Sequence, residues 1–389
     1  MPKLLRITTV PVSLHKLLQG QINYMQENGF EVILASAGGK EIEAIEKETG
    51  IPVHILPLTR KISPFTDLQA LWQTYKLIKK HKPDIVHTHT PKAGITGMLA
   101  AKLAGVPVRM HTVAGMPLME AKGIKRKILN LVEKCTYWSA TKIYPNSYGL
   151  KEFIIQDKLA HPSKLKVIAK GSSNGIDTAY FHPEHFSLSQ KENLKKQLGI
   201  NPEDTVFVFI GRLVGDKGIN ELIKAFQKLS GNQKNIKLLL VGNEEPELDP
   251  LQTETKENIL SNPQIITTGW VEDVRPYLAI SDILVFPSYR EGFPNVVLQA
   301  GAMGLPAIVT DINGCNEIIT HHHNGLIIPP KDEKAVYEAM NLLMENLELR
   351  SRLAQNARPG IEAKYKQEAV WEALLEEYRR ALRYTAKRT

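Results

Sequence analysis

Two cations on a glycine-rich segment are the first residues in the sequence that could do chemistry. The run GRLVGDKG follows an apolar stretch and precedes an amphipathic one, so Gly211, Arg212 and Lys217 fall on a loop at the start of a helix. Two cations five residues apart suit a diphosphate, and Gly215 and Gly218 let the backbone approach such a ligand closely. A surface loop with ordinary basic residues is the alternative interpretation.

The stretch SYREGFPNVVLQAGAMGLP, residues 288–306, places an acid before a turn and a nearly apolar helix. Pro294 suits the first helical position, and a helix that begins there presents free amide donors and its positive dipole end beside Glu291. Asn295 and Gln299 are four residues apart and share one face, which forms a polar stripe running back from the expected anion site. The alternative is a buried helix whose two side-chain amides are satisfied by neighbouring loops.

The histidines and cysteines are weaker candidates for functional residues. The run HHH at 321–323 holds adjacent side chains that do not converge easily on one ion, so we expect no metal there. His87 and His89 alternate and therefore face one side of a strand end, in the core or in a cleft. Cys135 and Cys315 lack the spacing of a disulfide framework or a zinc site.

The elements that must position these residues are short apolar runs alternating with helix-length amphipathic segments. Runs that are apolar without alternation, separated by helices, indicate parallel strands covered on both faces. The predicted strands are LLRITTV, EVILASA, VHILPL, DIVHTHT, VRMHTV, KIYPNS and LKVIAKGSS in the first half, and VFVFIGRL, IKLLLVGN, IITTGW, DILVFPS, PAIVTD and GLIIPP in the second.

We therefore predict two Rossmann-like, doubly wound α/β domains over residues 1–180 and 181–367, with the polar stretch 174–190 as their junction. A length of 389 residues agrees with two cores rather than one. Ligands of parallel sheets bind outside the carboxyl ends of the strands, so two such sheets facing one another would form a cleft lined by loops from both.

The composition, 43% hydrophobic and 23% charged, is that of a globular protein. No apolar run reaches the roughly 18 residues that span a bilayer, and the first residues do not resemble a secretory signal, so we expect a cytoplasmic location. The net charge of +8 suits an anionic partner. Composition alone leaves nucleic acid, anionic lipid and a phosphorylated small molecule open.

Basic residues gather in KGIKRKILNLVEK, residues 122–134, and in the tail 378–389. The first cluster predicts an amphipathic helix with a cationic face. Its apolar residues at helical spacing are Ile124, Ile128, Leu131, Val132 and Cys135. One interpretation is a solvated face over an ordinary core stripe, and the other is peripheral attachment to anionic headgroups through an apolar edge.

Taken together, these segments resemble the retaining glycosyltransferases of family 4, which have the two-Rossmann-domain GT-B fold. The resemblance covers nearly the whole chain. It rests on PDIVHTHTPKAG at 83–94, NGID and FHP within 174–183, GRLVGDKG at 211–218 and the run from GWVEDV to AIVTD at 269–311. KAGITGMLAAKLAGVP and PSYREGFPNVVLQAGAMGLPAIVTDINGCNEII are similar to bacterial enzymes that extend sugars on polyprenyl diphosphate carriers, including N-acetylgalactosaminyltransferases of protein N-glycosylation.

The resemblance implies roles for the residues of the donor site. Arg212 and Lys217, after Gly211, would neutralise the diphosphate of a nucleotide sugar, and Glu291 would meet the hydroxyls of the transferred sugar. The backbone around Val271 is where related enzymes hold the nucleobase. The segment whose amides would hold the phosphates comprises Gly292, Phe293, Pro294, Asn295 and Val296.

His111, in RMHTVAG, matches the family histidine that approaches the donor sugar from the other domain; by itself it would be a structural histidine. The sequence also departs from the family pattern. Gln299 replaces the second acid of the E-x7-E motif, which usually accepts a ribose hydroxyl. The first-strand loop reads VPVSLHKLLQG instead of a Gly-rich sequence, where His15 and Lys16 could contact an acceptor diphosphate or simply lie on a helix surface.

The resemblance implies transfer of a hexose or N-acetylhexosamine from a nucleoside diphosphate, with UDP favoured, to an acceptor hydroxyl with retention and without a metal ion or other cofactor. The expected acceptor is a polyprenyl-diphosphate-linked saccharide of bacterial surface polysaccharide or glycoprotein glycan synthesis. Such an acceptor would place the enzyme at the inner face of the cytoplasmic membrane, on an anionic surface, and no nucleic acid is expected. The final helix, 368–389, would pack back on the first domain. The alternatives are a UDP-sugar epimerase of the same fold and a non-catalytic sugar-nucleotide-binding partner.

Overall fold

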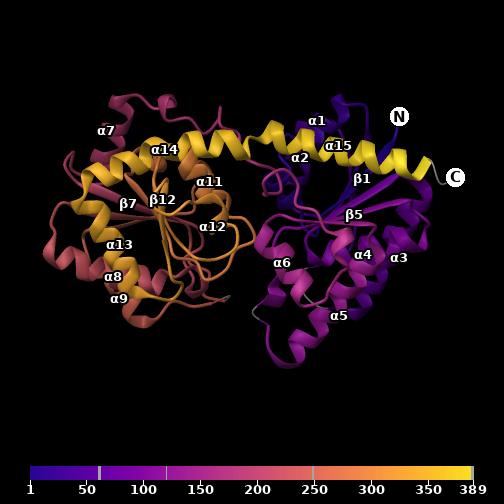
Figure 1. Cartoon of the computed structure of the whole chain (residues 1–389), viewed down its shortest axis with the longest axis horizontal. Helices are drawn as coiled ribbons and strands as arrows, with labels where there is room; N and C mark the ends of the chain where they lie inside the picture. The colour runs from indigo at the N-terminus through magenta and orange to yellow at the C-terminus, as the bar shows by residue number, and fades with distance from the viewer. Residues whose placement is uncertain (60–62, 120, 248, 387–389) are drawn as a thin grey trace. The chain divides into compact units, whose positions relative to one another are not determined.

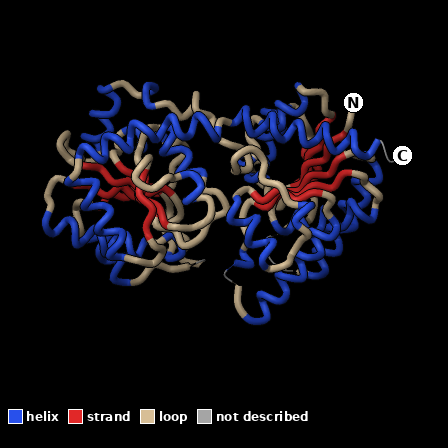
Figure 2. Tube along the Cα trace, in the orientation of Figure 1, coloured by secondary structure: helices blue, strands red, loops and turns tan. Residues whose placement is uncertain are grey.

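Each of two units in the chain folds around a six-stranded sheet with helices on its faces (Figures 1 and 2). The computed structural model describes all residues except 60–62, 120, 248 and 387–389. Unit 1 comprises Met1–Gly175 and Gln367–Thr389, and unit 2 comprises Ile176–Lys366. The predicted fold class, two doubly wound α/β domains, is confirmed.

Unit 1 has the strand order β3-β2-β1-β4-β5-β6, and every pairing is parallel. Successive residues along a strand enter different cores, since Leu4 belongs to one hydrophobic cluster and Leu5 to the other. Burial on both faces explains the apolar, non-alternating strand sequences. The strands are β1 (Lys3–Ile7), β2 (Glu31–Ser36), β3 (Val53–Ile55), β4 (Ile85–His89), β5 (Val108–Val113) and β6 (Lys142–Pro145).

The last helix of the chain belongs to unit 1. α15 (Gln367–Ala386) contacts α1 (Figure 1). It buries Val370, Leu374 and Tyr378 in the cluster that contains Leu4. The other helices of unit 1 are α1 (Gln21–Glu27), α2 (Ile42–Thr49), α3 (Pro64–His81), α4 (Pro91–Leu103), α5 (Gly123–Ser139) and α6 (Tyr148–Gln156), with short turns η1 (Ser13–Leu17), η2 (Pro117–Met119) and η3 (Pro162–Lys164).

One predicted strand of the first half is wrong. The run LKVIAKGSS, residues 165–173, forms only an isolated bridge between Leu165 and Ile143. The backbone explains the difference, because Ala169 has a φ of 48° and Ser172 a φ of 69°, which are left-handed values that no strand contains. This segment is therefore a turn-rich connection after α6.

Unit 2 repeats the topology, with the order β12-β11-β10-β7-β8-β9 and parallel pairings throughout. All six strands predicted for the second half are present, and the residues from Val206 to Phe209 are fully buried. The strands are β7 (Thr205–Ile210), β8 (Ile236–Val241), β9 (Ile265–Gly269), β10 (Ile283–Phe286), β11 (Ala307–Thr310) and β12 (Gly325–Ile328).

The helices of unit 2 surround a single hydrophobic cluster that includes both faces of its sheet. They are α7 (Leu188–Gln197), α8 (Ile219–Asn232), α9 (Thr253–Ser261), α10 (Arg275–Ala279), α11 (Asn295–Ala302), α12 (Cys315–Ile318), α13 (Glu333–Glu345) and α14 (Leu347–Tyr365), with turns η4 (Pro183–His185) and η5 (Gly215–Lys217). Among the described residues of both units, no helix has the length and apolar content needed to cross a membrane.

Candidate functional site

The strand order of unit 2 brings the two candidate segments together. The order reverses at β7, which pairs with β10 through Phe207 and Ile283, so the loops after these two strands leave the same sheet edge side by side. Lys217 ends η5 in the first loop, and Glu291 lies in the second. Their side chains form an ion pair and are 14% and 17% exposed, respectively.

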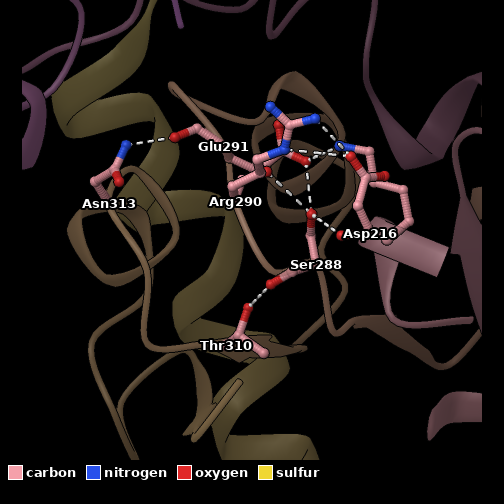
Figure 3. A network of polar contacts seen from close by, with 7 residues as sticks. Asp216, Ser288, Arg290, Glu291, Thr310 and Asn313 are labelled. Carbon is pink, nitrogen blue, oxygen red and sulfur yellow. Dashed lines mark hydrogen bonds and ion pairs between the residues drawn. The ribbon is translucent and has the colours of Figure 1, made fainter. Parts of the chain in front are cut away.

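Glu291 is held from both its side chain and its backbone. The Ser288 hydroxyl lies 3.0 Å from Glu291 Oε1, and the Asn313 side-chain amide donates to the Glu291 backbone oxygen (Figure 3). The Thr310 hydroxyl in turn donates to the Ser288 carbonyl. The described residues provide no hydrogen-bond partner for Glu291 Oε2, so this oxygen is available to a ligand.

A second ion pair ties the two loops to each other. Arg290 Nη2 lies 2.9 Å from Asp216 Oδ2 (Figure 3). The Tyr289 amide also donates to the Asp216 carbonyl at 2.9 Å. Asp216 immediately precedes Lys217, so these contacts fix the backbone from which the lysine extends. Sequence reasoning missed Ser288, Asp216 and Arg290 as supporting residues, although each lies inside a quoted motif.

Glycine is required where the first loop turns into α8. Gly218 has a φ of 72°, and a Cβ atom there would lie 2.1 Å from the Pro287 carbonyl oxygen. Because an L residue is strained at this φ and would also collide with the neighbouring backbone, only glycine fits. The close approach of the loop to Pro287 is what places Lys217 against Glu291.

Helix α11 begins one residue later than the sequence predicts. Pro294 has a φ of −76° and a ψ of 111°, so it is the extended residue before the helix and not its first turn. Within the described chain, the amides of Phe293, Asn295 and Val296 donate to no carbonyl or side chain. The helix terminus therefore still presents free donors next to Glu291 in the sequence, as expected for an anion site.

The polar stripe on α11 faces outward. α11 buries Val297, Leu298 and Ala300 and contacts α14, whereas Asn295 is exposed and Gln299 is half-buried. Neither side-chain amide has a hydrogen-bond partner in the part of the chain that the structure describes. The alternative of two amides satisfied by neighbouring loops is therefore wrong, and both side chains can bind a ligand.

Other predicted donor residues lie on the same unit without contacting the Lys217–Glu291 pair. Arg212 follows Gly211 directly after β7, but its side chain is 43% exposed and lies 3.5 Å from Glu245. Val271 is half-buried after β9. In the strand order, β9 is two strands away from β7, a separation of about 10 Å along the carboxyl edge.

His111 belongs to unit 1, where it lies near the end of β5. The side chain is 2% exposed, and Nδ1 lies 2.8 Å from the Thr88 hydroxyl. Burial lowers the pKa of His111 to about 4, so the imidazole is neutral at neutral pH. Gly94 of α4 leaves room for it, because a Cβ atom there would lie 2.5 Å from the ring.

The neighbouring histidines are core residues rather than cleft residues. The nitrogens of His87 lie 2.5 Å from the Tyr378 hydroxyl and 2.8 Å from the Thr112 hydroxyl, and His89 Nε2 lies 3.0 Å from Arg6 Nη2. Burial holds the pKa of both histidines well below the ordinary value.

The remaining candidates do not form sites of their own. His15 and Lys16 lie on η1, where the His15 ring is 3.8 Å from a Glu48 carboxylate oxygen and Lys16 is exposed. His321 Nδ1 accepts a hydrogen bond from the Ile327 amide at 2.9 Å. Across the described ranges, no group of three or more His, Cys, Asp or Glu side chains could hold a metal ion.

Comparisons with known proteins cover both units. A model of glycosyl transferases group 1 matches residues 190–359, and a model of the glycosyl transferase 4-like domain matches residues 15–171. The capsular polysaccharide biosynthesis glycosyltransferase CapM of Staphylococcus aureus is 34% identical over 96% of this chain and 95% of its own length. The UDP-Gal:alpha-D-GlcNAc-diphosphoundecaprenol alpha-1,3-galactosyltransferase of Escherichia coli is 33% identical over 73% of this chain and 72% of its own.

A solved structure shares the fold. The glycosyltransferase from Rickettsia africae superposes with a TM-score of 0.81, at 21% identity, over 98% of both chains. At this level of identity the likeness concerns the fold.

Proposed function

The chain belongs to the glycosyltransferases that combine a 4-like domain with a group 1 domain, and from this premise we propose that it transfers a hexose or N-acetylhexosamine from a UDP-sugar to a lipid-linked saccharide, with retention. The observation that carries the proposal is the Lys217–Glu291 pair, which unites the loops after β7 and β10 next to the free amides of α11. The cation and the helix terminus match the diphosphate that leaves a donor, and the carboxylate matches the hydroxyls of the donor sugar.

In this proposal the diphosphate binds the cationic part of the site. Breaking the bond between the anomeric carbon and the diphosphate leaves negative charge on the phosphate oxygens, so the largest task is to stabilise the leaving group. Lys217 and the free amides at the start of α11 are held in place before the ligand arrives. Arg212 adds a second cation when its side chain turns from Glu245 to the diphosphate.

Glu291 is suited to the sugar. Its Oε1 is occupied by the Lys217 ammonium and the Ser288 hydroxyl, whereas Oε2 can accept a hydrogen bond from a sugar hydroxyl. Because Lys217 contacts the same carboxylate, the sugar and the diphosphate would be held by two neighbouring side chains. This couples the position of the sugar to that of its leaving group.

The nucleoside extends from the diphosphate along unit 2. Gln299 lies one helical turn beyond Asn295 on α11 and would accept a ribose hydroxyl through its side-chain oxygen. The backbone around Val271 would hold the uracil, and its separation of about 10 Å from β7 suits the span of a nucleoside diphosphate. The nucleotide therefore needs only residues of unit 2.

His111 of unit 1 would approach the donor sugar as a neutral imidazole, which can donate or accept a hydrogen bond. In the proposed reaction, an oxygen of the donor phosphate takes the proton of the acceptor hydroxyl on the face from which the diphosphate departs. The site then requires neither a protein nucleophile nor a metal ion, because Lys217, Arg212 and the amides carry the charge.

The names of the relatives support a lipid-linked saccharide as the proposed acceptor. The Escherichia coli enzyme is named for a saccharide on diphosphoundecaprenol, and the Staphylococcus aureus protein for capsular polysaccharide biosynthesis. We infer that this chain extends a polyprenyl-diphosphate-linked saccharide in bacterial surface polysaccharide or glycoprotein glycan synthesis, at the inner face of the cytoplasmic membrane.

A donor screen tests the proposal. The purified protein is melted with individual nucleotide sugars, and those that stabilise it are incubated with a short polyprenyl-diphosphate saccharide. We expect UDP-sugars to stabilise the protein, a mass increase of one sugar on the acceptor, and an anomeric configuration in the product that matches the donor. A Glu291→Gln variant is the negative control, because it should bind UDP and fail to transfer.

Two outcomes would contradict this function. Conversion of the UDP-sugar to an isomer without acceptor would show an epimerase. Binding of UDP-sugars without product on any lipid-diphosphate acceptor would show a non-catalytic binding protein.

A further inference from the structure

Helix α5 of unit 1 turns its apolar side to solvent. Ile124 is 77% exposed, Leu131 is 70% exposed and Ile128 is 45% exposed. At 3.6 residues per turn these three side chains lie within an arc of about 60°, and Trp138, 62% exposed, continues the stripe at the other end of the helix. In Figure 1, α5 lies at the lower edge of unit 1.

The side of α5 that packs against unit 1 is comparatively polar. Glu133, Thr136 and Tyr137 are all buried, and Arg126 pairs with Asp157 at 2.5 Å. The interpretation of residues 122–134 as a solvated face over a core stripe is therefore wrong for Ile124, Ile128 and Leu131, which are exposed; Val132 and Cys135 are half-buried. The acid of this helix is buried and its isoleucines are exposed. An exposed apolar stripe of this kind indicates a surface that binds an apolar partner.

Lysines flank the apolar stripe on both sides. Lys125 lies on one side and Lys127 and Lys134 lie on the other, and all three are exposed, as is Lys122 before the helix. The one acid of the helix, Glu133, is buried. The surface is thus apolar along its centre and cationic along its borders.

This arrangement distinguishes among partners. A second copy of the same surface would bring lysines against lysines, which opposes a dimer through this face. An anionic bilayer fits both features, since the isoleucines can enter the boundary between headgroups and acyl chains while the lysines meet the headgroups.

We propose that the α5 surface, comprising Ile124, Ile128, Leu131 and the flanking lysines, binds the surface of an anionic lipid bilayer. The binding requires no donor and no acceptor, so it stands apart from the transfer reaction and is measured without it. Each lysine at such a surface contributes about 1 kcal/mol, or about fivefold in partitioning.

The test is flotation of the full chain with vesicles of phosphatidylcholine alone or of equimolar phosphatidylcholine and phosphatidylglycerol. We expect binding to the anionic vesicles only. A variant with Lys125→Glu, Lys127→Glu and Lys134→Glu should partition at least about 100-fold more weakly, from fivefold at each position. Its matched control changes three exposed lysines of unit 2, as Lys196→Glu, Lys228→Glu and Lys234→Glu, and should bind normally.

A second variant tests the apolar stripe separately. Ile124→Ser, Ile128→Ser and Leu131→Ser together should weaken binding by about 100-fold. The control substitutes three exposed leucines of unit 2, as Leu188→Ser, Leu260→Ser and Leu347→Ser. Because all these side chains are exposed, each variant should melt as the parent does, and the charge variant tests the proposal even if the serine variant does not fold.

The proposal is overturned if the chain floats with neither vesicle, or if the α5 variants bind as well as their controls. A concentration-dependent dimer that the serine variant abolishes would assign the stripe to a second copy instead.

Discussion

Removing the charge of Lys217 should damage the reaction more than the fold. Lys217→Met keeps most of the side chain's length and leaves Glu291 with the Ser288 hydroxyl as its remaining partner. Loss of one partner from a well-buried ion pair costs about 3 to 5 kcal/mol, and since water reaches both side chains here we expect about 2 kcal/mol of unfolding free energy. Loss of a donor that faces developing charge should lower kcat/KM by at least about 100-fold, or about 2.7 kcal/mol.

Two measurements separate the effects. Thermal unfolding of Lys217→Met alone and combined with Glu291→Gln reports stability, and the double variant should recover most of the loss because no charge is left unpaired. Calorimetric titration with UDP reports the diphosphate contact. Lys217→Met should weaken UDP binding, whereas Glu291→Gln should retain it and lose transfer.

Lys256→Met is the control, because Lys256 pairs with Glu244 at 3.1 Å in the same unit and forms no ion pair with Glu291. It should unfold and turn over much as the parent does. Near-normal turnover and UDP affinity in folded Lys217→Met would refute the reasoning, since the ammonium would then serve only to hold Glu291.

Three further predictions concern other residues. Arg212→Ala should lower transfer by at least about 100-fold with the fold intact, since its ion pair with Glu245 is on the surface; initial rates and melting curves check this. Gln299→Glu should preserve or improve UDP affinity, by about 1 kcal/mol if a carboxylate replaces the amide at a ribose hydroxyl; abolished binding in a folded protein would give Gln299 another task. His111 has a pKa of about 4 in the folded chain against an ordinary 6.5. Between these two pH values the imidazole is therefore protonated in the unfolded chain and neutral in the folded chain. The stability it contributes above pH 6.5 should be lost as the pH falls to 4, by about 3 kcal/mol, and denaturation of His111→Gln should depend less steeply on pH than that of the parent.

Much of the fold follows from the sequence because both sheets are buried on two sides. Each strand of unit 2 contains a run of two to five consecutive apolar residues, and these short runs between helix-length segments identify the strands. The failure at 165–173 has a local cause, since the apolar residues Leu165, Val167 and Ile168 are followed by left-handed backbone that composition does not reveal. Such residues are buried without belonging to a strand.

The parts of the site that could be predicted are those in which a single residue, by its type and its position next to a strand or helix, indicates its role. A glycine before α8, a lysine in the loop after β7 and an acid after β10 are visible in the sequence. The contacts of Asp216 with Arg290 were not, because they depend on β7 and β10 being neighbours in the sheet although β8 and β9 lie between them in the chain. The side to which the α5 stripe turns was equally invisible, since helical spacing defines a face but not what covers it.

The return of α15 to unit 1 bears on the order in which the protein forms during synthesis. Tyr378 contacts His87 across 291 positions of sequence, and Val370 and Leu374 complete the same core. Unit 2, which is contiguous, has all its residues once Lys366 has left the ribosome. Unit 1 must wait for α15, so the first unit translated is the last to finish folding, contrary to the usual order along a chain. A chain that stops at Lys366 would carry a complete unit 2 and a unit 1 with an open, aggregation-prone core.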